Sequence, residues 1–402
     1  MQVFSIKLNT RQTIKIDKGI FVDLLDLSHI KDYKAYSEAI EKNEISFANL
    51  KDLAVKASVP YPLFFAPRRV VDYQIKDKDK KLYEKIPTKE EIRLSSRGRV
   101  EVKDIELIVK DLGRKQEFLK SRVLPNSELN RFIGSAAVKL KANNTIESVA
   151  TEIRKFLRID LTYLRSINKE KVLSYITSCA EGKGILISFS SYNYMPQNIN
   201  PELELSGICI KDKKFPYIFI NTRDGDSQPK IIESSGRQIF TLLSMIACIA
   251  MGKFVLSSKT GISKDDPTKL AYSIAAEILI PKGDLRNFES GTIDDLKEKA
   301  HYFRVTPSML LYQLRQQKKI NLELTNLFRQ QLRQEIKKAE PKHKHAPHPT
   351  TAYRKYNGER FSREVITAYK LGKISQIEVK NILFRHGKMD TNLFNEYKGK
   401  FK

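Results

Sequence analysis

The chain has 402 residues, and its 72 lysines and arginines outnumber its 47 aspartates and glutamates, which gives a formal net charge of +25. Apolar residues make up 41% of the chain, which excludes a protein that is disordered throughout. The three cysteines lie far apart, which excludes a disulfide framework and fits a reducing cytoplasm. The longest uncharged apolar run, residues 239–252, is too short to cross a bilayer core of ~30 Å. We therefore expect a cytoplasmic protein with no membrane partner.

The excess positive charge is unevenly distributed along the chain. Residues 181–300 carry 15 lysines and arginines and 15 acidic residues, whereas residues 311–402 carry 21 and 8. A neutral centre with basic flanks favours DNA as a partner, because cationic side chains neutralise phosphates and release counterions. A solvated lysine-rich surface is the alternative interpretation of the same charges.

Residues 1–70 form the first predicted region. Its alternating residues predict a short strand pair within residues 1–18, and a loosely amphipathic pattern predicts a helical stretch from Ile20 to Lys42. Ser46 is expected to cap a further helix over Phe47–Ala57.

A charged linker and an α+β domain are expected next. Residues 71–104 are highly charged and contain SSRGR, which predicts a linker or a long loop. Residues 105–290 predict a small sheet with packed helices. Its expected helices are 104–123, 144–157, 169–181, 239–256 and 270–279, and its expected strands are 184–189, 205–210 and 217–221. The 239–256 segment is apolar all round and is expected to be the central buried helix.

The C-terminal part is predicted to be helical and basic. Residues 291–340 predict a helix-turn-helix-like element followed by a long helix, with Thr306 as N-cap and Pro307 in the first helical position. Residues 341–352 are expected to be a linker, and residues 353–402 a basic helical module. In this module we expect Ser375 to cap a helix whose residues Ile377, Val379 and Ile382 face inward.

Several segments together resemble the ImmA/IrrE family of zinc metallopeptidase-like proteins. RQIFTLLSMIACIAMG (237–252) is similar to the active-site helix of that family, and AAEILIP (275–281) to its second core helix. YIFIN (217–221) is similar to the strand before the active-site helix, and FRVTPSMLLYQLRQQKKI (303–320) to the element after it. The likeness covers residues 43–402. It implies a zincin-like core flanked by a mainly helical N-terminal region and by helix-turn-helix-like C-terminal regions. NEISFANLKDLAVKASVPYPLFFAP (43–67) is similar to the end of the helix-turn-helix domain that often precedes the family's core, so the resemblance implies that residues 1–70 are a remnant of such a domain.

The chain departs from the family where the chemistry takes place. Catalysis there needs two histidines at i and i+4 as zinc ligands and a glutamate beside the first as general base. The matching places hold Ser244, Met245 and Cys248, and the place of the acidic third ligand holds Thr268. No histidine lies between residues 30 and 300, so no shift of the motif restores it. Because a serine hydroxyl is a poor zinc ligand and one thiolate cannot hold zinc alone, we expect no bound zinc and no other cofactor. Because methionine cannot accept a proton from water, the general base is absent and we expect no catalysis.

Two basic elements are candidates for DNA binding. The second helix of the 292–319 element is expected to expose Gln313, Gln316 and Gln317, and glutamine can pair with adenine. The candidate contacts in both elements are Arg315, Lys318, Lys319, Arg354, Lys355, Arg360, Arg363, Lys373, Lys380 and Arg385. The alternative in both elements is that the charges are only solvated.

The resemblance implies a regulator of a phage, a mobile element or a toxin–antitoxin or defence system. The sequence therefore predicts a catalytically inactive ImmA/IrrE-type protein that binds a protein partner, such as a repressor, a toxin or a defence component, and associates with DNA. A second hypothesis is a protein-interaction module, an antitoxin or counter-defence protein, without nucleic-acid binding. A third is an active zinc peptidase or a cysteine peptidase that uses Cys248.

Overall fold

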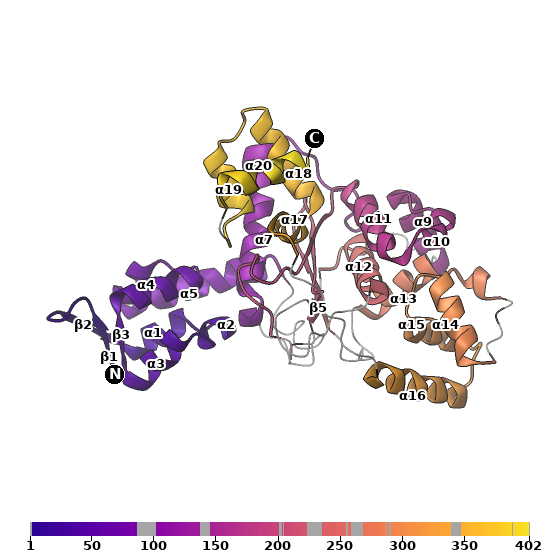
Figure 1. Ribbon diagram of the computed structural model, residues 1–402, viewed down its shortest axis with the longest axis horizontal. Helices are drawn as coiled ribbons and strands as arrows, with labels where there is room; N and C mark the ends of the chain where they lie inside the picture. Colours follow the sequence, from indigo (N-terminus) through magenta and orange to yellow (C-terminus); the bar gives the residue numbers. More distant parts are fainter. Residues whose placement is uncertain are drawn as a thin grey trace.

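The structure is a computed structural model, and it describes residues 2–86, 102–136, 145–200, 203, 205–222, 235–254, 256–258, 268–286, 288, 291–338, 347–387 and 389–401. It has the α+β class expected from the sequence, with one sheet near the N-terminus and another in the centre. Figure 1 shows the N-terminal region at one end of the molecule, helices α14 to α16 at the other, and the C-terminal helices above the central sheet.

The N-terminal region combines a three-stranded sheet with short helices. The sheet has the order β2-β1-β3 and consists of β1 (Val3–Lys7), β2 (Thr13–Asp17) and β3 (Glu44–Ser46). The expected strand pair is confirmed as an antiparallel hairpin, and β3 adds a parallel partner to β1. The helices are α1 (Lys18–Leu24), α2 (Ser28–Lys31), α3 (Lys34–Lys42), α4 (Phe47–Lys56) and the 3-10 turn η1 (Tyr61–Phe65). Ser46 caps α4 as expected, since its hydroxyl accepts from the Asn49 N–H at 3.2 Å.

The prediction of a linker over residues 71–104 is wrong for its first part. Residues Arg68–Tyr83 form helix α5, of which only Val71 and Leu82 are buried. Ion pairs between residues four apart support this helix in place of an apolar stripe, as in the pair Asp77–Lys81 at 2.7 Å. Residues 87–101, which include SSRGR, lie outside the described residues.

The central sheet is mixed and is covered on both faces. It has the order β4-β6-β5-β7, with β4 parallel to β6 and with β5 antiparallel to both of its neighbours. The strands are β4 (Leu186–Phe189), β5 (Leu205–Ile210), β6 (Tyr217–Ile220) and β7 (Leu256–Ser258). Every residue of β5 and β6 is buried, because successive side chains point into two different cores.

One face of the sheet packs against a helical core. Ile187, Cys209 and Ile218 share this core with the apolar helix α12 (Ser235–Ala250). It also includes α9 (Ile146–Leu157), α10 (Leu161–Ser166), α11 (Lys169–Glu181) and α13 (Thr268–Leu279). The expected extension of α12 to Leu256 is wrong, because the chain turns at Gly252, which has a φ of 70°, and Leu256 begins β7.

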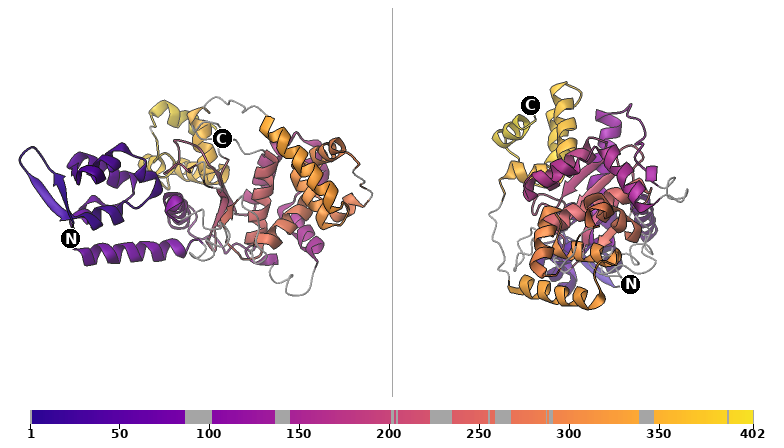
Figure 2. Two further views of the ribbon diagram at one scale, coloured as in Figure 1. Left: turned by 90° about the horizontal axis from the view of Figure 1, so that it is seen from below. Right: turned by 90° about the vertical axis from the view of Figure 1, so that its right-hand side faces the viewer.

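The opposite face of the sheet packs against α7 and the C-terminal helices. Leu186, Ile208 and Phe219 belong to this second core. The helices are α7 (Glu106–Phe118) with the π-helical turn η3 (Leu119–Val123), α17 (Pro349–Asn357), α18 (Glu359–Lys370), α19 (Gln376–Leu383) and α20 (Thr391–Gly399). Residues 353–402 are therefore not a separate module, as the sequence had suggested, but one layer of the central fold (Figures 1 and 2).

Two details of the C-terminal layer show how it is built. Gly358 joins α17 to α18 with a φ of 82°, and a Cβ there would overlap the carbonyl oxygen of Ile187 on β4. The expected cap of α19 by Ser375 is confirmed, and Val379 is buried, but Ile377 is 71% exposed and does not face inward. The expected linker 341–352 is also shortened, because α17 begins at Pro349; residues 341–346 lie outside the described part.

The structure contains the helix pair that was predicted at the start of residues 291–340. Helices α14 (Ile293–Tyr302) and α15 (Pro307–Gln316) are joined by a turn in which Thr306 caps α15, and α16 (Leu322–Lys338) follows. The remaining short turns are η2 (Val102–Asp104) and η4 (Lys282–Leu285). Across the described ranges, no helix has both the length and the apolar character needed to cross a membrane.

Candidate functional site

The middle of α12 is the place where the resemblance would position a zinc site. Ser244, Met245 and Cys248 are all completely buried there. The Ser244 hydroxyl donates to the Phe240 carbonyl oxygen at 2.7 Å, one turn back in the same helix. The Cys209 sulfur on β5 lies 3.4 Å from the Met245 sulfur. These side chains therefore pack as ordinary core between the helix and the sheet.

These residues do not fit a zinc ion. Zinc sites in proteins use thiolate, imidazole and carboxylate ligands, and α12 offers one hydroxyl, one thioether and one thiol in their place. Thr268 is the first residue of α13, and its side chain lies outside the described part. Among the described residues, no group of three or more histidine, cysteine, aspartate and glutamate side chains is placed to hold a metal ion.

Glu277 is an acidic residue of α13, the helix that packs beside α12. Its carboxylate accepts a hydrogen bond from the Lys282 backbone N–H at 2.9 Å, just after α13 ends. Burial raises the pKa of this carboxylate, and the donation from Lys282 opposes the rise. The side chain thus stabilises the turn that follows its own helix.

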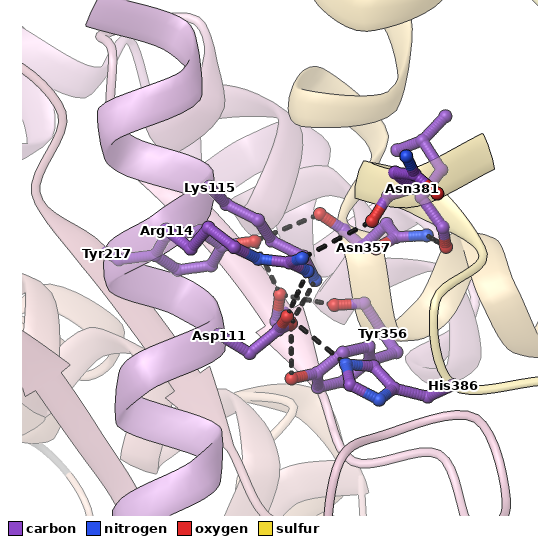
Figure 3. A network of polar contacts seen from close by, with 10 residues as sticks. Asp111, Arg114, Lys115, Tyr217, Tyr356, Asn357, Asn381 and His386 are labelled. Atoms are coloured by element: carbon purple, nitrogen blue, oxygen red, sulfur yellow. Dashed lines mark hydrogen bonds and ion pairs between the residues drawn. The ribbon is translucent and has the colours of Figure 1, made fainter. Parts of the chain in front are cut away.

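Ionisable groups gather instead on the opposite face of the sheet, around Asp111 of α7 (Figure 3). One carboxylate oxygen contacts Arg114 at 2.6 Å and His386 at 3.2 Å. The other accepts from the Tyr356 hydroxyl at 2.9 Å and lies 3.2 Å from the Lys115 ammonium. Asp111, Lys115 and Tyr356 are all buried, so this carboxylate is a charged centre between α7 and the C-terminal helices.

The electrostatics of the Asp111 network follow from burial and from opposite charges. Burial by itself raises the pKa of Asp111, but Lys115, His386 and Arg114 together hold that pKa well below its ordinary value. Burial lowers the pKa of Lys115 to about 8, although Asp111 opposes this shift. The Lys115 ammonium also lies 3.9 Å from the centre of the Tyr356 ring, where the π-face favours the cation.

Neutral hydrogen bonds connect this network to the sheet. The hydroxyls of Ser188 on β4 and Tyr217 on β6 lie 2.7 Å apart. Ser188 donates to the carbonyl oxygen of Tyr356, and Tyr217 donates to that of Asn357 at 3.0 Å. The network thus joins α7, two strands and α17. Sequence analysis missed it, because its members come from four distant segments; the only local signal was two charged residues, Asp111 and Lys115, on the apolar side of α7.

Most of the predicted DNA contacts on the C-terminal helices already have partners within the protein. Arg354 and Arg363 pair with Glu359 at 2.9 and 3.2 Å, and Arg360 donates to the carbonyl oxygen of Glu181. Lys355 donates to the hydroxyl of Thr222 at 2.9 Å. The three other candidates on this layer, Lys373, Lys380 and Arg385, lie on or next to α19, where Lys373 and Arg385 are exposed.

Helix α15, the second helix of the candidate DNA-binding element 292–319, is partly closed to solvent. Gln313, which was expected to be exposed, is buried, and so are four other residues of α15. A Cβ at Gly236 in the first turn of α12 would lie 3.2 Å from the Thr306 nitrogen, so the turn before α15 is packed against the core. Arg315 and Lys318 are exposed, and Lys319 donates to the carbonyl oxygen of Arg286 at 2.5 Å. The exposed side chains of α15 are Ser308 near its start and Arg315 and Gln316 at its end.

Comparisons of the chain with protein-family models, with curated proteins and with solved structures find no match. The likeness to the ImmA/IrrE family therefore stays a prediction from the residues.

Proposed function

We propose that this chain is a non-catalytic, ImmA/IrrE-like regulatory protein that acts by binding a protein partner. The observation that carries the proposal is the packing of Ser244, Met245 and Cys248, which are completely buried between α12 and the sheet. A hydrolytic site needs a ligand or a base within reach of a water molecule. Ser244 bonds within α12 and Met245 lies against Cys209 of β5, so these side chains help to fill the space between the helix and the sheet, which supports a scaffold role.

The partner in this proposal is a repressor, a toxin or a defence component of a phage, a mobile element or a toxin–antitoxin system. DNA association is a second part of the proposal. It is supported by the exposed cations Arg315, Lys318 and Lys373, which belong to a C-terminal segment, residues 311–402, with 21 basic and 8 acidic residues. Internal pairing of Arg354, Arg360 and Arg363 favours weak contact with phosphates over reading of bases.

The scaffold role is tested by elemental analysis of the purified full chain together with thermal unfolding in the presence and absence of a chelator. We expect less than one zinc per chain and the same melting temperature in both conditions. Stoichiometric zinc, with a melting temperature that falls on chelation, would overturn the proposal and favour an active peptidase.

DNA association is tested separately by a mobility-shift assay at two salt concentrations. We expect binding that weakens steeply as salt rises, and a further loss in the variant Lys318→Glu/Lys373→Glu. Lys34→Glu is a matched control, because Lys34 is an exposed lysine of α3 on the N-terminal region. Absence of binding at low salt would exclude DNA association. It would favour the alternative hypothesis, a protein-interaction module without nucleic-acid binding.

A further inference from the structure

A hollow of about 470 Å³ lies where α9 ends and α10 begins. Its lining consists of Thr151, Arg154, Lys155, Arg158, Ile159, Asp160 and Leu161. The chain reverses sharply at Arg158, which has a φ of 59°, and the Ile159 N–H donates back to the Arg154 carbonyl oxygen at 2.9 Å. This turn brings the last residues of one helix and the first of the next around a single concave surface.

Arg154 is fixed in this hollow by neutral acceptors. Its guanidinium donates to the Glu277 carbonyl oxygen at 2.9 Å and to the Thr151 hydroxyl at 2.8 Å. Burial lowers its pKa, and the electrostatic attraction of the Glu277 and Asp284 carboxylates opposes this shift. A half-buried cation whose direct partners are all neutral keeps its charge available to an anion, and its orientation is set in advance.

Two more cations line the same hollow. Lys155 and Arg158 are exposed, and neither side chain has a hydrogen-bond or ion-pair partner in the part of the chain that the structure describes. The one acidic residue of the lining, Asp160, is already used, because its carboxylate accepts from the backbone N–H groups of Thr162 and Tyr163 at 2.8 and 3.2 Å. The lining therefore carries three positive charges against one carboxylate that caps α10.

We propose that this hollow binds a small anion that carries phosphate groups, of the nucleotide class. Its volume of about 470 Å³ is sufficient for a ligand of this size, and the hollow is wide open to solvent. Guanidinium and ammonium groups are the usual protein partners of phosphate oxygens. The partly exposed side chain of Leu161 adds an apolar contact for the non-ionic part of such a ligand. This site is independent of the proposed scaffold role, which concerns α12.

The competing explanation is that these cations only stabilise the negative end of α9. Basic side chains in the last turn of a helix interact favourably with its dipole, and Arg154 and Lys155 both lie in that turn. The two explanations differ in what is lost on substitution. A role in helix stability predicts a change in melting temperature alone, whereas a ligand site predicts a loss of anion affinity.

The test is isothermal titration of the full chain with inorganic pyrophosphate and with ATP, each without divalent metal. We expect both to bind, and the variant Lys155→Gln/Arg158→Asn to bind at least about tenfold more weakly, because two charge-assisted contacts are removed. Asparagine tolerates the positive φ at position 158. Lys171→Gln on α11, a substitution of an exposed lysine outside the lining, is the control and should leave affinity unchanged.

Arg154→Lys is a second variant that keeps the charge but loses the planar fork, and we expect it to weaken pyrophosphate binding as well. The proposal is overturned if neither pyrophosphate nor ATP binds, or if the double variant binds them as the unsubstituted chain does. It is also overturned if duplex DNA binds through Lys155 and Arg158 while both small anions do not, which would assign the hollow to a nucleic-acid backbone.

Discussion

The two faces of the central sheet differ in what they bury. The face toward α12 is filled by apolar and sulfur-containing side chains, including Met245 and Cys248 at the places where the family resemblance would put catalytic groups. The face toward α7 and the C-terminal helices buries a carboxylate, an ammonium and several hydroxyls around Asp111. The buried ionisable side chains around Asp111 therefore join distant segments of the chain. They do not lie on the α12 face, where the resemblance implies a reaction.

The largest effect is expected on the charged face. Asp111→Ala leaves Lys115 buried without its carboxylate, and we expect the free energy of unfolding to fall by about 3–5 kcal/mol. Urea unfolding at pH 7 measures this loss. Asp52→Ala is the control, because the Asp52–Lys56 pair lies on the surface of α4 and should contribute less than about 1 kcal/mol.

A double variant sharpens this prediction. Asp111→Ala/Lys115→Met removes both charges, so it should recover much of the stability lost in Asp111→Ala alone. Equal stability of the Asp111→Ala and Asp52→Ala variants would show that the network does not hold α7 and the C-terminal helices together.

The second effect concerns the apolar face. Met245→Ala opens a cavity beside Cys209, and we expect a loss of about 2–5 kcal/mol in the free energy of unfolding. Met245→Leu conserves most of the volume and should cost less than about 1.5 kcal/mol. If Met245→Ala unfolds at the same denaturant concentration as the unsubstituted chain, the middle of α12 is not packed core and the contrast between the two faces fails.

The third effect is a pH dependence at the edge of the charged face. Burial raises the pKa of Glu181 to about 7, although its carboxylate accepts from the Arg360 backbone N–H at 3.1 Å. Because the folded-state pKa lies above that of the unfolded chain, Glu181 favours folding fully at acidic pH, and this contribution is lost as pH rises through about 7. The shift corresponds to roughly 3 kcal/mol at most.

Glu181→Gln separates this group from the other titrating residues. The amide can still accept from Arg360 but carries no charge, so the variant should exceed the unsubstituted chain in stability at pH 8 and match it more closely at pH 5. Urea unfolding at both pH values measures the difference. An identical pH profile for the two proteins would show that Glu181 does not titrate in this range.

Local patterns explain which parts of this fold were predictable. The three strands over residues 184–221, the Thr306 and Ser375 caps and the buried α12 all depend on neighbouring residues, and their positions were expected within a few residues. The cover of the sheet by residues 349–399 depends on contacts between segments more than 150 residues apart, such as that of Ser188 with Tyr356. Helix α5 was missed because charge pairs and not apolar periodicity support it.

The candidate site was predictable only in part for a similar reason. The replacement of zinc ligands at positions 244, 245 and 248 is visible in the residues themselves. Whether a charged side chain is free to bind a partner is not visible in the sequence. It depends on which carboxylates or carbonyls, distant in the sequence, the fold brings close to it. Arg354, Arg360 and Arg363 looked like a phosphate-binding surface, and the fold supplies Glu359 and Glu181 as their partners.

The smallest effect is expected at Ser244. Its hydroxyl is bonded to the carbonyl oxygen one turn back, so Ser244→Ala removes this bond without leaving an unpaired donor, and alanine is the better helix former. We expect a change within about 0.5 kcal/mol in the free energy of unfolding, the same with and without chelator. A metal position would behave differently, because loss of a ligand would remove binding energy that stabilises only the folded chain. The contrary result would be a Ser244→Ala variant that is much less stable than the unsubstituted chain without chelator and equally stable with it. That result would indicate a metal bound at the middle of α12 and would favour a catalytic role for that face.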